Sequence, residues 1–515
     1  MHIEQTIKTD LLVVGGGING TGVAVDASLR GLSVVLTESN DLAGATSSAS
    51  SKLIHGGLRY LEQYDFKLVR SSLKEREILL NKAPHIIHPL RFVLPHNKKL
   101  RPVWQMRVGL FLYDLLAGRT QLAPSKKISL HGDYQKGLGL KDQFTIGFEY
   151  SDCRIDDARM VVFNAQQAES CGAKILLPFA CVKLQREKNW WCAKLASKDG
   201  QLITVYAKAV VNAAGPWAQQ FMQQVLGINK PSSMRSVKGS HFVIPKLYQG
   251  DHAYILQNAD GRIVFALPYG FTAPHQNDFT LVGTTEVDYQ DDLNAITMDQ
   301  AERDYLCDTI NQYFVRQIKP SDILWDYSGV RPLYDNAKVN NPSKIGREYH
   351  IEQEDYDGLP ILSIFGGKIT SFRMLSQQVV DRLKPYFNAI KASPTATIPA
   401  IGGDIFSFSE LFNNIQQRYP WLDKKHAYRL ASSYGTETFL FLQHAKNYHD
   451  LGQCFGYNFY EIEAKYMVDH EWCYTLEAMI WRRSKLGLWL NKEEMLAVKR
   501  WLVNYKAEKN LSFPT

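Results

Sequence analysis

The sequence predicts an α/β fold, α+β overall, with a mainly parallel sheet, an inserted domain of mostly antiparallel strands and a helical C-terminal domain. Three observations predict it. A strand–turn–helix–strand unit occupies residues 11–38, short β-like runs separated by Gly, Pro and Asn fill residues 238–325, and helical apolar periodicity prevails after residue 406. The 515 residues allow two to four domains of about 150 residues each.

The first unit has the order expected of a βαβ motif. The apolar run Leu11–Val14 predicts a buried strand, and residues 15–20 form a Gly-rich turn that opens a helix ending near Arg30. A second strand, Leu32–Leu36, follows, and Glu38 stands 21 residues after Gly17. These parts and their spacing match the dinucleotide-binding fingerprint.

Each residue of that fingerprint has a physical role. Gly15 allows the tight turn, Gly17 lets the backbone approach a pyrophosphate, and Gly20 lets the helix pack on the strand. The helix N-terminus favours the negative charge of the phosphates, and Glu38 would accept hydrogen bonds from ribose hydroxyls. A purely structural Gly-rich turn is the alternative.

Two later turns favour FAD over a nicotinamide cofactor. Residues 212–215 follow the strand Ala209–Val211, and Gly366-Gly367 follows the strand Ile361–Phe365 and precedes a helix from Thr370 to Leu383. Three such turns could line one extended ligand, and the late helix N-terminus would stabilise the negative charge of a reduced flavin. Ordinary strand-to-helix corners would give the same pattern.

The segment Ala45–Tyr60 is rich in hydroxyl groups and contains Gly56 and Gly57. Its hydroxyls and amides suit hydrogen bonds to pyrophosphate and isoalloxazine, and the two glycines would let the backbone lie against a flavin. A flexible loop is the alternative that composition alone allows.

Further elements are expected between and after these turns. Residues 156–170 predict a helix capped by Asp156 or Asp157, Lys174–Leu177 predicts a strand, and a hairpin is expected around the turn Ser197–Gly200. No apolar stretch precedes the first strand, so neither a secretory signal nor a transit peptide is expected.

The composition limits the possible functions. With 45% hydrophobic and 22% charged residues, the chain is neither a disordered protein nor a small disulfide scaffold. Its formal charge of +7 suits anionic small molecules or anionic lipid, and we expect no nucleic-acid partner. Seven dispersed cysteines without a Cys-x-x-Cys pair indicate a reducing compartment.

His85 and His88 have no third ligand nearby in the sequence, so no metal site is expected.

Taken together, the motifs resemble those of the bacterial FAD-dependent (aerobic, respiratory) glycerol-3-phosphate dehydrogenases. The stretches that carry the resemblance extend over nearly the whole chain: residues 15–20, 47–60, 148–153, 238–241, 327–333 and 365–368. The resemblance implies oxidation of sn-glycerol 3-phosphate to dihydroxyacetone phosphate, with hydride passing to FAD and electrons then passing to membrane quinone. A homodimer is a further expectation from the family.

We therefore predict a Rossmann-like FAD-binding domain built from separated segments, an inserted, mostly antiparallel β substrate domain and a C-terminal helical domain. The predicted boundaries are 1–75, 150–225 and 335–388 for the FAD-binding domain, 76–149 and 226–334 for the substrate domain, and 389–515 for the helical domain. The predicted FAD-binding residues are Gly15, Gly17, Ile18, Asn19, Gly20, Glu38, Thr46, Ser47, Ser48, Ser51, Lys52, Leu53, His55, Gly56, Gly57, Ala180, Cys181, Ala214, Gly215, Trp217, Gly367, Lys368 and Thr370.

The substrate side needs a cationic grip on the phosphate and a base for the alcohol proton. Arg331 and Lys368 are the predicted cations, although on sequence alone each could be a surface salt-bridge partner. His241 is the first candidate for the base, because its ordinary pKa of about 6.5 allows proton exchange near neutral pH. The alternative is that Lys368 and Arg331 acidify the substrate hydroxyl. Arg59 and Tyr60 resemble substrate contacts of the family.

Residues 97–116 could contact an anionic lipid surface. A cationic cluster at residues 97–102 precedes an apolar helical face formed by Trp104, Val108, Phe111, Leu112 and Leu115. A helix buried in the core would show the same stripe. No uninterrupted apolar run reaches the roughly 18 residues of a membrane span. We expect a peripheral or monotopic protein on the cytoplasmic side of the inner (plasma) membrane.

Three other functions remain open. They are a glycerol-3-phosphate oxidase that reduces oxygen to peroxide, an amino-acid oxidase in which Arg331 binds a carboxylate, and a flavin-binding sensor without turnover.

The chain also departs from the family just before Arg482 and Arg483, where residues 477–481 replace an acid that relatives often carry. This departure puts any salt bridge to these two arginines in question.

Overall fold

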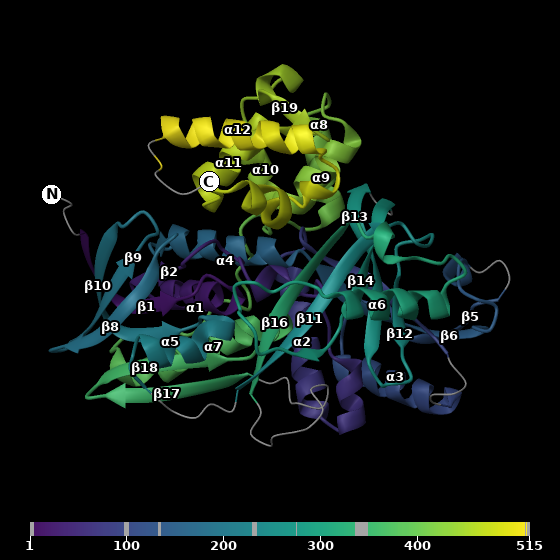
Figure 1. The fold of residues 1–515 in the computed structure, drawn as a ribbon, viewed down its shortest axis with the longest axis horizontal. Coiled ribbons are helices and arrows are strands. Elements are labelled where there is room, and N and C mark those ends of the chain that lie inside the picture. Colours follow the sequence, from purple (N-terminus) through teal and green to yellow (C-terminus); the bar gives the residue numbers. More distant parts are fainter. Residues whose placement is uncertain are drawn as a thin grey trace.

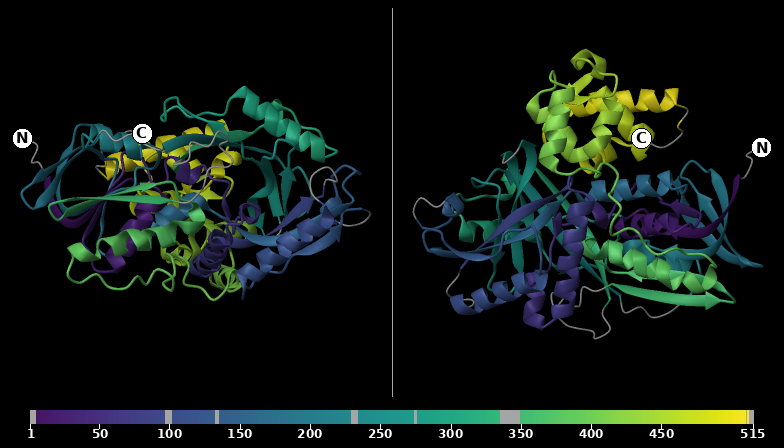
Figure 2. Two further views of the ribbon diagram at one scale, coloured as in Figure 1. Left: turned by 90° about the horizontal axis from the view of Figure 1, so that it is seen from below. Right: turned by 180° about the vertical axis from the view of Figure 1, so that it is seen from behind.

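The computed structural model describes residues 5–96, 102–131, 135–228, 234–273, 276–334, 349–509 and 511. Figure 1 shows two sheet domains side by side, with a helical domain formed by the C-terminal part of the chain lying across them. The views in Figure 2 agree with this arrangement. The predicted fold class is confirmed.

The first sheet is mainly parallel. Its strands lie in the order β17-β18-β10-β1-β2-β7, and the pairs β18-β10, β10-β1, β1-β2 and β2-β7 are all parallel. β17 pairs antiparallel with β18, and the hairpin β8-β9 extends β10. The strands are β1 (Gln5–Val14), β2 (Val34–Thr37), β7 (Lys174–Leu176), β8 (Ala180–Glu187), β9 (Trp190–Ala196), β10 (Leu202–Asn212), β17 (His350–Tyr356) and β18 (Leu359–Phe365).

β1 is buried on both faces, as its continuous apolar run predicts. Leu11 and Val13 pack with side chains of α1 (Ile18–Leu29), α4 (Asp157–Ser170) and α7 (Phe372–Arg382), whereas Leu12 and Val14 pack with the β8-β9 hairpin. The second cluster also includes Phe221 of α5 (Ala218–Gln224). Because the side chains of a strand alternate between faces, one apolar run fills both cores.

The second sheet is mostly antiparallel, as predicted. Its order is β15-β11-β14-β13-β12-β4-β6-β3, with β16 paired to β11 and β5 to β6, and among these pairs only β12-β4 is parallel. The strands are β3 (Leu53–Ile54), β4 (Ile87–Pro95), β5 (Lys126–Ser129), β6 (Ile146–Ile155), β11 (Met234–Pro245), β12 (Ala253–Gln257), β13 (Ile263–Ala273), β14 (Gln276–Gly283), β15 (Val287–Asp288) and β16 (Trp325–Tyr334).

Three helices accompany this sheet within the described residues, namely α2 (Phe66–Lys82), α3 (Val103–Ala117) and α6 (Gln300–Tyr313). No helix was predicted at the position of α6. It begins at a capping box in which Asp299 accepts the amide of Glu302 and Glu302 accepts the amide of Asp299. That signal was present in the sequence but lies inside a region dominated by strand-like runs.

The sheet membership differs from the predicted domain boundaries. β3 belongs to the second sheet although it lies within residues 1–75. β6 crosses the predicted boundary between residues 149 and 150, and α2 crosses the one between residues 75 and 76. The boundaries shift because strand pairing, which the local pattern does not reveal, decides to which sheet a segment belongs.

The C-terminal domain has its own apolar core, which includes Leu430, Met467, Ile480 and Val498. Its helices are α8 (Phe408–Arg418), α9 (Lys424–Tyr434), α10 (Thr438–Phe441), α11 (Glu461–Glu471) and α12 (Lys492–Glu508), with a small hairpin of β19 (Cys454–Gly456) and β20 (Phe459–Tyr460).

Buried ion pairs join this domain to the first sheet domain. Arg159 of α4 donates to both carboxylate oxygens of Glu471 at 2.7 Å, and both side chains are fully buried. Arg482 and Arg483 both bind Asp41, and Arg482 also pairs with Glu477 at 2.6 Å. Both arginines therefore form salt bridges despite the departure from the family, because the main carboxylate comes from the opposite end of the chain.

Candidate active site

The three glycine turns meet at one edge of the first sheet. Strands β18, β10 and β1 are parallel neighbours, so the turns at their carboxyl ends are neighbours as well. A Cβ atom on Gly15 would lie 2.5 Å from the carbonyl oxygen of Ala213, and the Asn19 side-chain amide donates to the carbonyl of Gly366 at 3.1 Å. The predicted convergence of the turns is confirmed.

The first turn is shaped for a close backbone approach. Gly15 has a φ of +112°, and a Cβ atom on Gly20 would lie only 1.9 Å from the Gly15 carbonyl oxygen. Ser47 accepts a hydrogen bond from the amide of Ile18 at 2.9 Å. The Oδ1 atom of Asn19 is buried and has no hydrogen-bond partner among the described residues. A bound dinucleotide would fit both the open cradle and this unsatisfied oxygen.

Glu38 lies at the end of β2, beside the first turn. Its carboxylate accepts the amide of Gly16 at 2.7 Å and the amide of Asn40 at 2.8 Å. Burial raises the pKa of Glu38, and these two hydrogen bonds counteract the rise because they stabilise the ionised form. The carboxylate is thereby fixed at the position where the fingerprint places a ribose.

The segment around residues 46–51 is held between the two sheets. Thr46 donates its hydroxyl to the carbonyl of Val330 in β16 at 2.7 Å, and Tyr327 donates to the carbonyl of Ser50 at 2.9 Å. A Cβ atom on Gly329 would lie 2.9 Å from the Cβ of Ala49, which shows how closely β16 approaches. The segment is therefore not the flexible loop that composition allows.

Two side chains of this segment, Lys52 and Ser48, bind other groups of the protein. The ammonium of Lys52 pairs with Asp157 at 2.9 Å and donates to the carbonyl of Ser48 at 2.9 Å. The hydroxyl of Ser48 donates to the carbonyl of Ala45 at 3.3 Å. Lys52 thus anchors the segment to α4, so its charge is already neutralised.

The end of the segment is fixed by the second domain. Gly56 donates its amide to the hydroxyl of Tyr113 at 2.9 Å, and Tyr113 donates to Asp152. Asp152 in turn pairs with Arg76 of α2 at 2.8 Å. His55 donates its amide to the hydroxyl of Thr370 at 3.3 Å, so the third turn is connected to the same network. Tyr113, Asp152 and Arg76 were not predicted, because only the fold brings them together.

The other predicted FAD-binding residues lie around the same edge. The amide of Phe179, just before Ala180 and Cys181, donates to the carbonyl of Glu38 at 2.7 Å. Burial raises the pKa of the Cys181 thiol to about 12, so the thiol is uncharged. The remaining members of the set take these positions: Gly17 at the N-cap of α1, Leu53 in β3, Ser51 and Gly57 in the segment after Thr46, Ala214, Gly215 and Trp217 after β10, and Gly367 after β18.

His241 lies behind the segment rather than at a surface. It is only 1% exposed, its Nε2 atom is 2.8 Å from the hydroxyl oxygen of Ser51, and its ring stacks on Tyr327. Burial first, and then the charges of Arg331 and Lys52, hold the pKa of His241 well below 6.5. The imidazole is therefore neutral at physiological pH, and the expectation that it titrates near neutrality is wrong.

A glycine that the sequence did not single out makes room for this ring. Gly283 of β14 pairs with His241 in the sheet, and a Cβ atom on Gly283 would lie 2.2 Å from the imidazole. Nothing in the local sequence marks Gly283, since the requirement comes from the neighbouring strand.

Lys368 contacts Tyr60, and Arg331, which comes from the other sheet, interacts electrostatically with the same tyrosine. The ammonium of Lys368 lies 3.9 Å from the centre of the Tyr60 ring. Burial lowers the pKa of Arg331, and the neighbouring Tyr60 opposes that shift. A guanidinium nitrogen of Arg331 is 3.9 Å from a carboxylate oxygen of Glu286, a further residue that the sequence did not indicate. The side chain of Arg59 lies outside the described residues.

The arrangement combines a dinucleotide cradle with a cationic pair. Among the described residues, no group of three or more His, Cys, Asp or Glu side chains could hold a metal ion.

Comparison with known proteins identifies the cofactor class. The family model described as FAD dependent oxidoreductase matches residues 10–371. The chain belongs to the FAD-dependent oxidoreductase family. Residues 393–509 match the model described as the C-terminal domain of alpha-glycerophosphate oxidase.

Individual relatives cover almost the whole chain. A protein of Pseudomonas aeruginosa named glycerol-3-phosphate dehydrogenase is 46% identical over 495 residues, which cover 96% of this chain and 94% of the relative. A D-erythritol 1-phosphate dehydrogenase of Brucella abortus is 43% identical, with 96% of this chain and 98% of the relative covered.

A solved structure supports the same assignment. The glycerol-3-phosphate dehydrogenase of Bacillus halodurans complexed with FAD is 25% identical, has a TM-score of 0.74 and covers 100% of this chain and 92% of its own. The predicted family resemblance and the predicted cofactor, FAD, are both confirmed. The residues that would hold FAD are those of the three turns, Glu38 and the segment after Thr46.

Replacement of Gly20 by Ala should abolish retention of FAD. The new methyl group would collide with the Gly15 carbonyl at 1.9 Å and force the phosphate turn open. The ratio of flavin to protein absorbance after gel filtration measures the loss. Gly109→Ala is the matched control, because this helical glycine in α3 has no atom within 4 Å of its Cβ position. Equal flavin contents in the two variants would contradict the assigned cradle.

Proposed function

We propose that the protein oxidises sn-glycerol 3-phosphate to dihydroxyacetone phosphate and passes the electrons to a membrane quinone. The relative from Pseudomonas aeruginosa is named for this substrate, and the protein of known structure from Bacillus halodurans is named for it as well. FAD, when bound, supplies the acceptor for the hydride. The remaining tasks fall to side chains of this chain.

The observation that most supports the proposal is the convergence of Arg331 and Lys368 beside Tyr60. Arg331 comes from β16 of the second sheet, and Lys368 follows the glycine turn after β18 of the first sheet. A guanidinium can grip a phosphate through two parallel hydrogen bonds, and an ammonium adds a compact second charge. Because the two cations come from different sheets, they can contact opposite parts of one small anionic substrate.

The alcohol proton needs an acceptor as the hydride leaves the same carbon. Since His241 is buried behind Ser51, we propose that Ser51 passes the proton to the Nε2 atom of His241. Arg331 and Lys368 assist by stabilising the developing negative charge on the substrate oxygen. The sequence left two alternatives open, His241 as the base or acidification of the substrate hydroxyl by Lys368 and Arg331, and this arrangement combines them.

A second substrate, D-erythritol 1-phosphate, deserves testing because a relative named for it is 43% identical over nearly the whole chain. The two compounds share a phosphate and a polyol chain, so the same cationic pair would serve both. A glycerol-3-phosphate oxidase is the other enzyme candidate, since the C-terminal domain matches a family model named for that activity.

We further propose that α3 contacts the lipid surface. Its Trp104, Val108, Phe111 and Leu115 are 67%, 49%, 65% and 64% exposed, so the stripe does not belong to a buried core helix. Such an exposed apolar face, with one tryptophan, suits insertion into the headgroup region. The cationic residues 97–101 that complete the prediction lie outside the described residues.

The position of α3 is compatible with this proposal. Figures 1 and 2 show α3 on the side of the molecule away from the C-terminal helical domain. None of the helices in the described part of the chain is long and apolar enough to cross a bilayer. We propose peripheral or monotopic attachment at the cytoplasmic face of the membrane, with electrons leaving to quinone there. A homodimer stays a prediction from the family.

Anaerobic addition of glycerol 3-phosphate should bleach the flavin absorbance near about 450 nm. The comparison substrates are D-erythritol 1-phosphate, glycine, sarcosine and D-alanine. In a separate variant, Arg331→Lys should raise KM for glycerol 3-phosphate at least about tenfold, because the bidentate contact to the phosphate is lost. Faster bleaching by erythritol phosphate would reassign the substrate, and bleaching by amino acids alone would contradict a phosphate site. Quinone reduction without stoichiometric peroxide separates the dehydrogenase from the oxidase.

Replacement of His241 by Asn should lower kcat by about a hundredfold while KM changes little, because a proton acceptor is lost and the phosphate grip is kept. In the wild-type protein, burial and then the charges of Arg331 and Lys52 hold the pKa of His241 well below that of a free imidazole. The rate loss due to its protonation is therefore expected only at lower pH. Unchanged turnover and an unchanged pH profile in His241→Asn would exclude it from proton transfer.

The double substitution Trp104→Glu with Phe111→Glu should release the protein from vesicles of anionic phospholipid. Each change places a charge on the exposed apolar face, where its insertion into lipid is unfavourable. Vesicle sedimentation measures the bound fraction. Leu496→Glu, at a 48% exposed site on α12, is the matched control. Equal sedimentation of the two variants would remove α3 as the lipid contact.

A further inference from the structure

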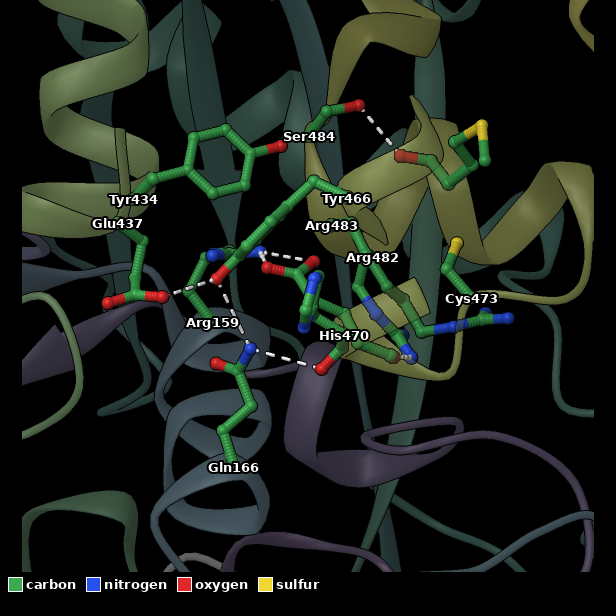
Figure 3. Close-up of polar contacts among 12 residues, drawn as sticks. Arg159, Gln166, Tyr434, Glu437, Tyr466, His470, Cys473, Arg482, Arg483 and Ser484 are labelled. Carbon is green, nitrogen blue, oxygen red and sulfur yellow. Dashed lines mark hydrogen bonds and ion pairs between the residues drawn. The ribbon is translucent and has the colours of Figure 1, made fainter. Parts of the chain in front are cut away.

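Two consecutive arginines of the C-terminal domain bind a carboxylate of the FAD-binding domain. Arg482 and Arg483 end the π-helical turn Ala478–Arg483, and Figure 3 shows their side chains leaving this turn side by side. The Nε atom of Arg482 is 2.5 Å from Asp41, and Arg483 donates to both oxygens of Asp41, at 2.7 and 2.8 Å. Asp41 is only 8% exposed. This is a bidentate, desolvated contact rather than a surface ion pair.

Asp41 lies in the short loop that carries Glu38 and closes over the phosphate turn. Glu38 accepts the amide of Gly16 at 2.7 Å, and two residues beyond Asp41 the amide of Ala43 donates to the carbonyl of Gly16 at 3.1 Å. The loop is thus bonded to both the amide and the carbonyl of Gly16 in the phosphate turn. Any displacement of Asp41 would be transmitted to Glu38 and to the turn.

The two arginines also neutralise the negative charge that Asp41 places in this loop. Asp41 acts on Glu38 as a like charge and contributes to the raised pKa of Glu38. Despite burial, Arg483 and Arg482 hold the pKa of Asp41 below its ordinary value, so Asp41 remains ionised and neutralised. Without the two cations, the buried carboxylate of Asp41 and the partly buried carboxylate of Glu38 would repel each other without compensation.

The arginines are themselves held in place. Arg483 is fully buried and donates to the carbonyl of Glu471 at 2.8 Å, and the Glu471 side chain binds Arg159 of α4. Figure 3 shows Arg159 and the arginine pair in the same polar cluster at the boundary between the two domains. The backbone carbonyl of Glu471, rather than its side chain, therefore helps to hold Arg483 beside Asp41.

We propose that the C-terminal domain has a role in FAD binding, in which Arg483, assisted by Arg482, neutralises Asp41 and so holds Glu38 in position for the ribose. Arg483 is in this sense a positioning residue for the cofactor, although the C-terminal domain carries none of the flavin motifs. The inference rests on the role proposed for Glu38, and it concerns cofactor affinity rather than the substrate.

The test measures the dissociation constant of FAD from the holoenzyme, by the fluorescence of flavin released on serial dilution. Arg483→Met should raise this constant about tenfold, since coupling energies between linked sites are commonly of that size. Adding Asp41→Asn to Arg483→Met removes the carboxylate that has lost Arg483, so the double variant should return to within about threefold of the wild type. A role confined to domain docking would not allow this rescue, because the double variant lacks the contact of Asp41 with Arg483 and also loses its ion pair with Arg482.

The matched control is Arg159→Met with Glu471→Gln, which removes a buried pair at the same domain boundary without touching the loop. It should leave FAD affinity unchanged. Wild-type affinity in Arg483→Met, or no rescue by Asp41→Asn, would overturn the inference. If Arg483→Met does not fold, the double variant decides alone: near-wild-type affinity supports the inference and a tenfold loss overturns it. Unchanged affinity in Glu38→Gln would instead refute the proposed role of Glu38.

Discussion

The parallel alignment of β18, β10, β1 and β2 is the constraint on which the rest of the structure depends. Because these strands run in the same direction, their carboxyl ends share one edge, and turns separated by hundreds of residues become neighbours. The hydrogen bond from Asn19 to Gly366 and the close approach of Gly15 to Ala213 are direct consequences. A site of this kind can be specified only by a chain that returns repeatedly to one sheet.

The second sheet contributes by holding the segment after Thr46 against that edge. β16 binds the segment through Val330 and Tyr327, and Lys52 anchors it to Asp157. Buried charge pairs of this type add little net stability compared with apolar packing, but they are costly to break and so define one arrangement. The segment can therefore present amides and hydroxyls to a flavin without rearrangement. The same strand carries Arg331, the proposed substrate contact.

The C-terminal domain supplies charges to a site whose motifs lie elsewhere. Its arginines reach Asp41, and its Glu471 binds Arg159 on α4. A domain attached by buried, hydrogen-bonded ion pairs has a defined position, because any displacement would leave several charges desolvated without partners. The role proposed for Arg483 would make the helical domain part of the cofactor-binding unit.

The sequence by itself determined the local elements and the cofactor class. The apolar runs, the glycine spacing and Glu38 were sufficient to predict the βαβ unit, because these signals lie within a few residues of one another. The three glycine turns were also correctly expected to lie close together. The family resemblance also pointed to Arg331, Lys368 and His241. What these local patterns could not provide was the protonation of His241, because its burial depends on β14, β16 and the segment containing Ser51.

Only the tertiary structure decided the remaining features. The partners of Lys52, Arg483 and Gly56 lie far from them along the chain, and no local pattern encodes such pairs. The stripe on α3 predicted a helix in either environment, and only the packing of neighbouring elements left that face exposed. Periodicity and spacing report what a segment can form, whereas desolvation and long-range pairing arise when segments meet, and these set the charges and the geometry of the site.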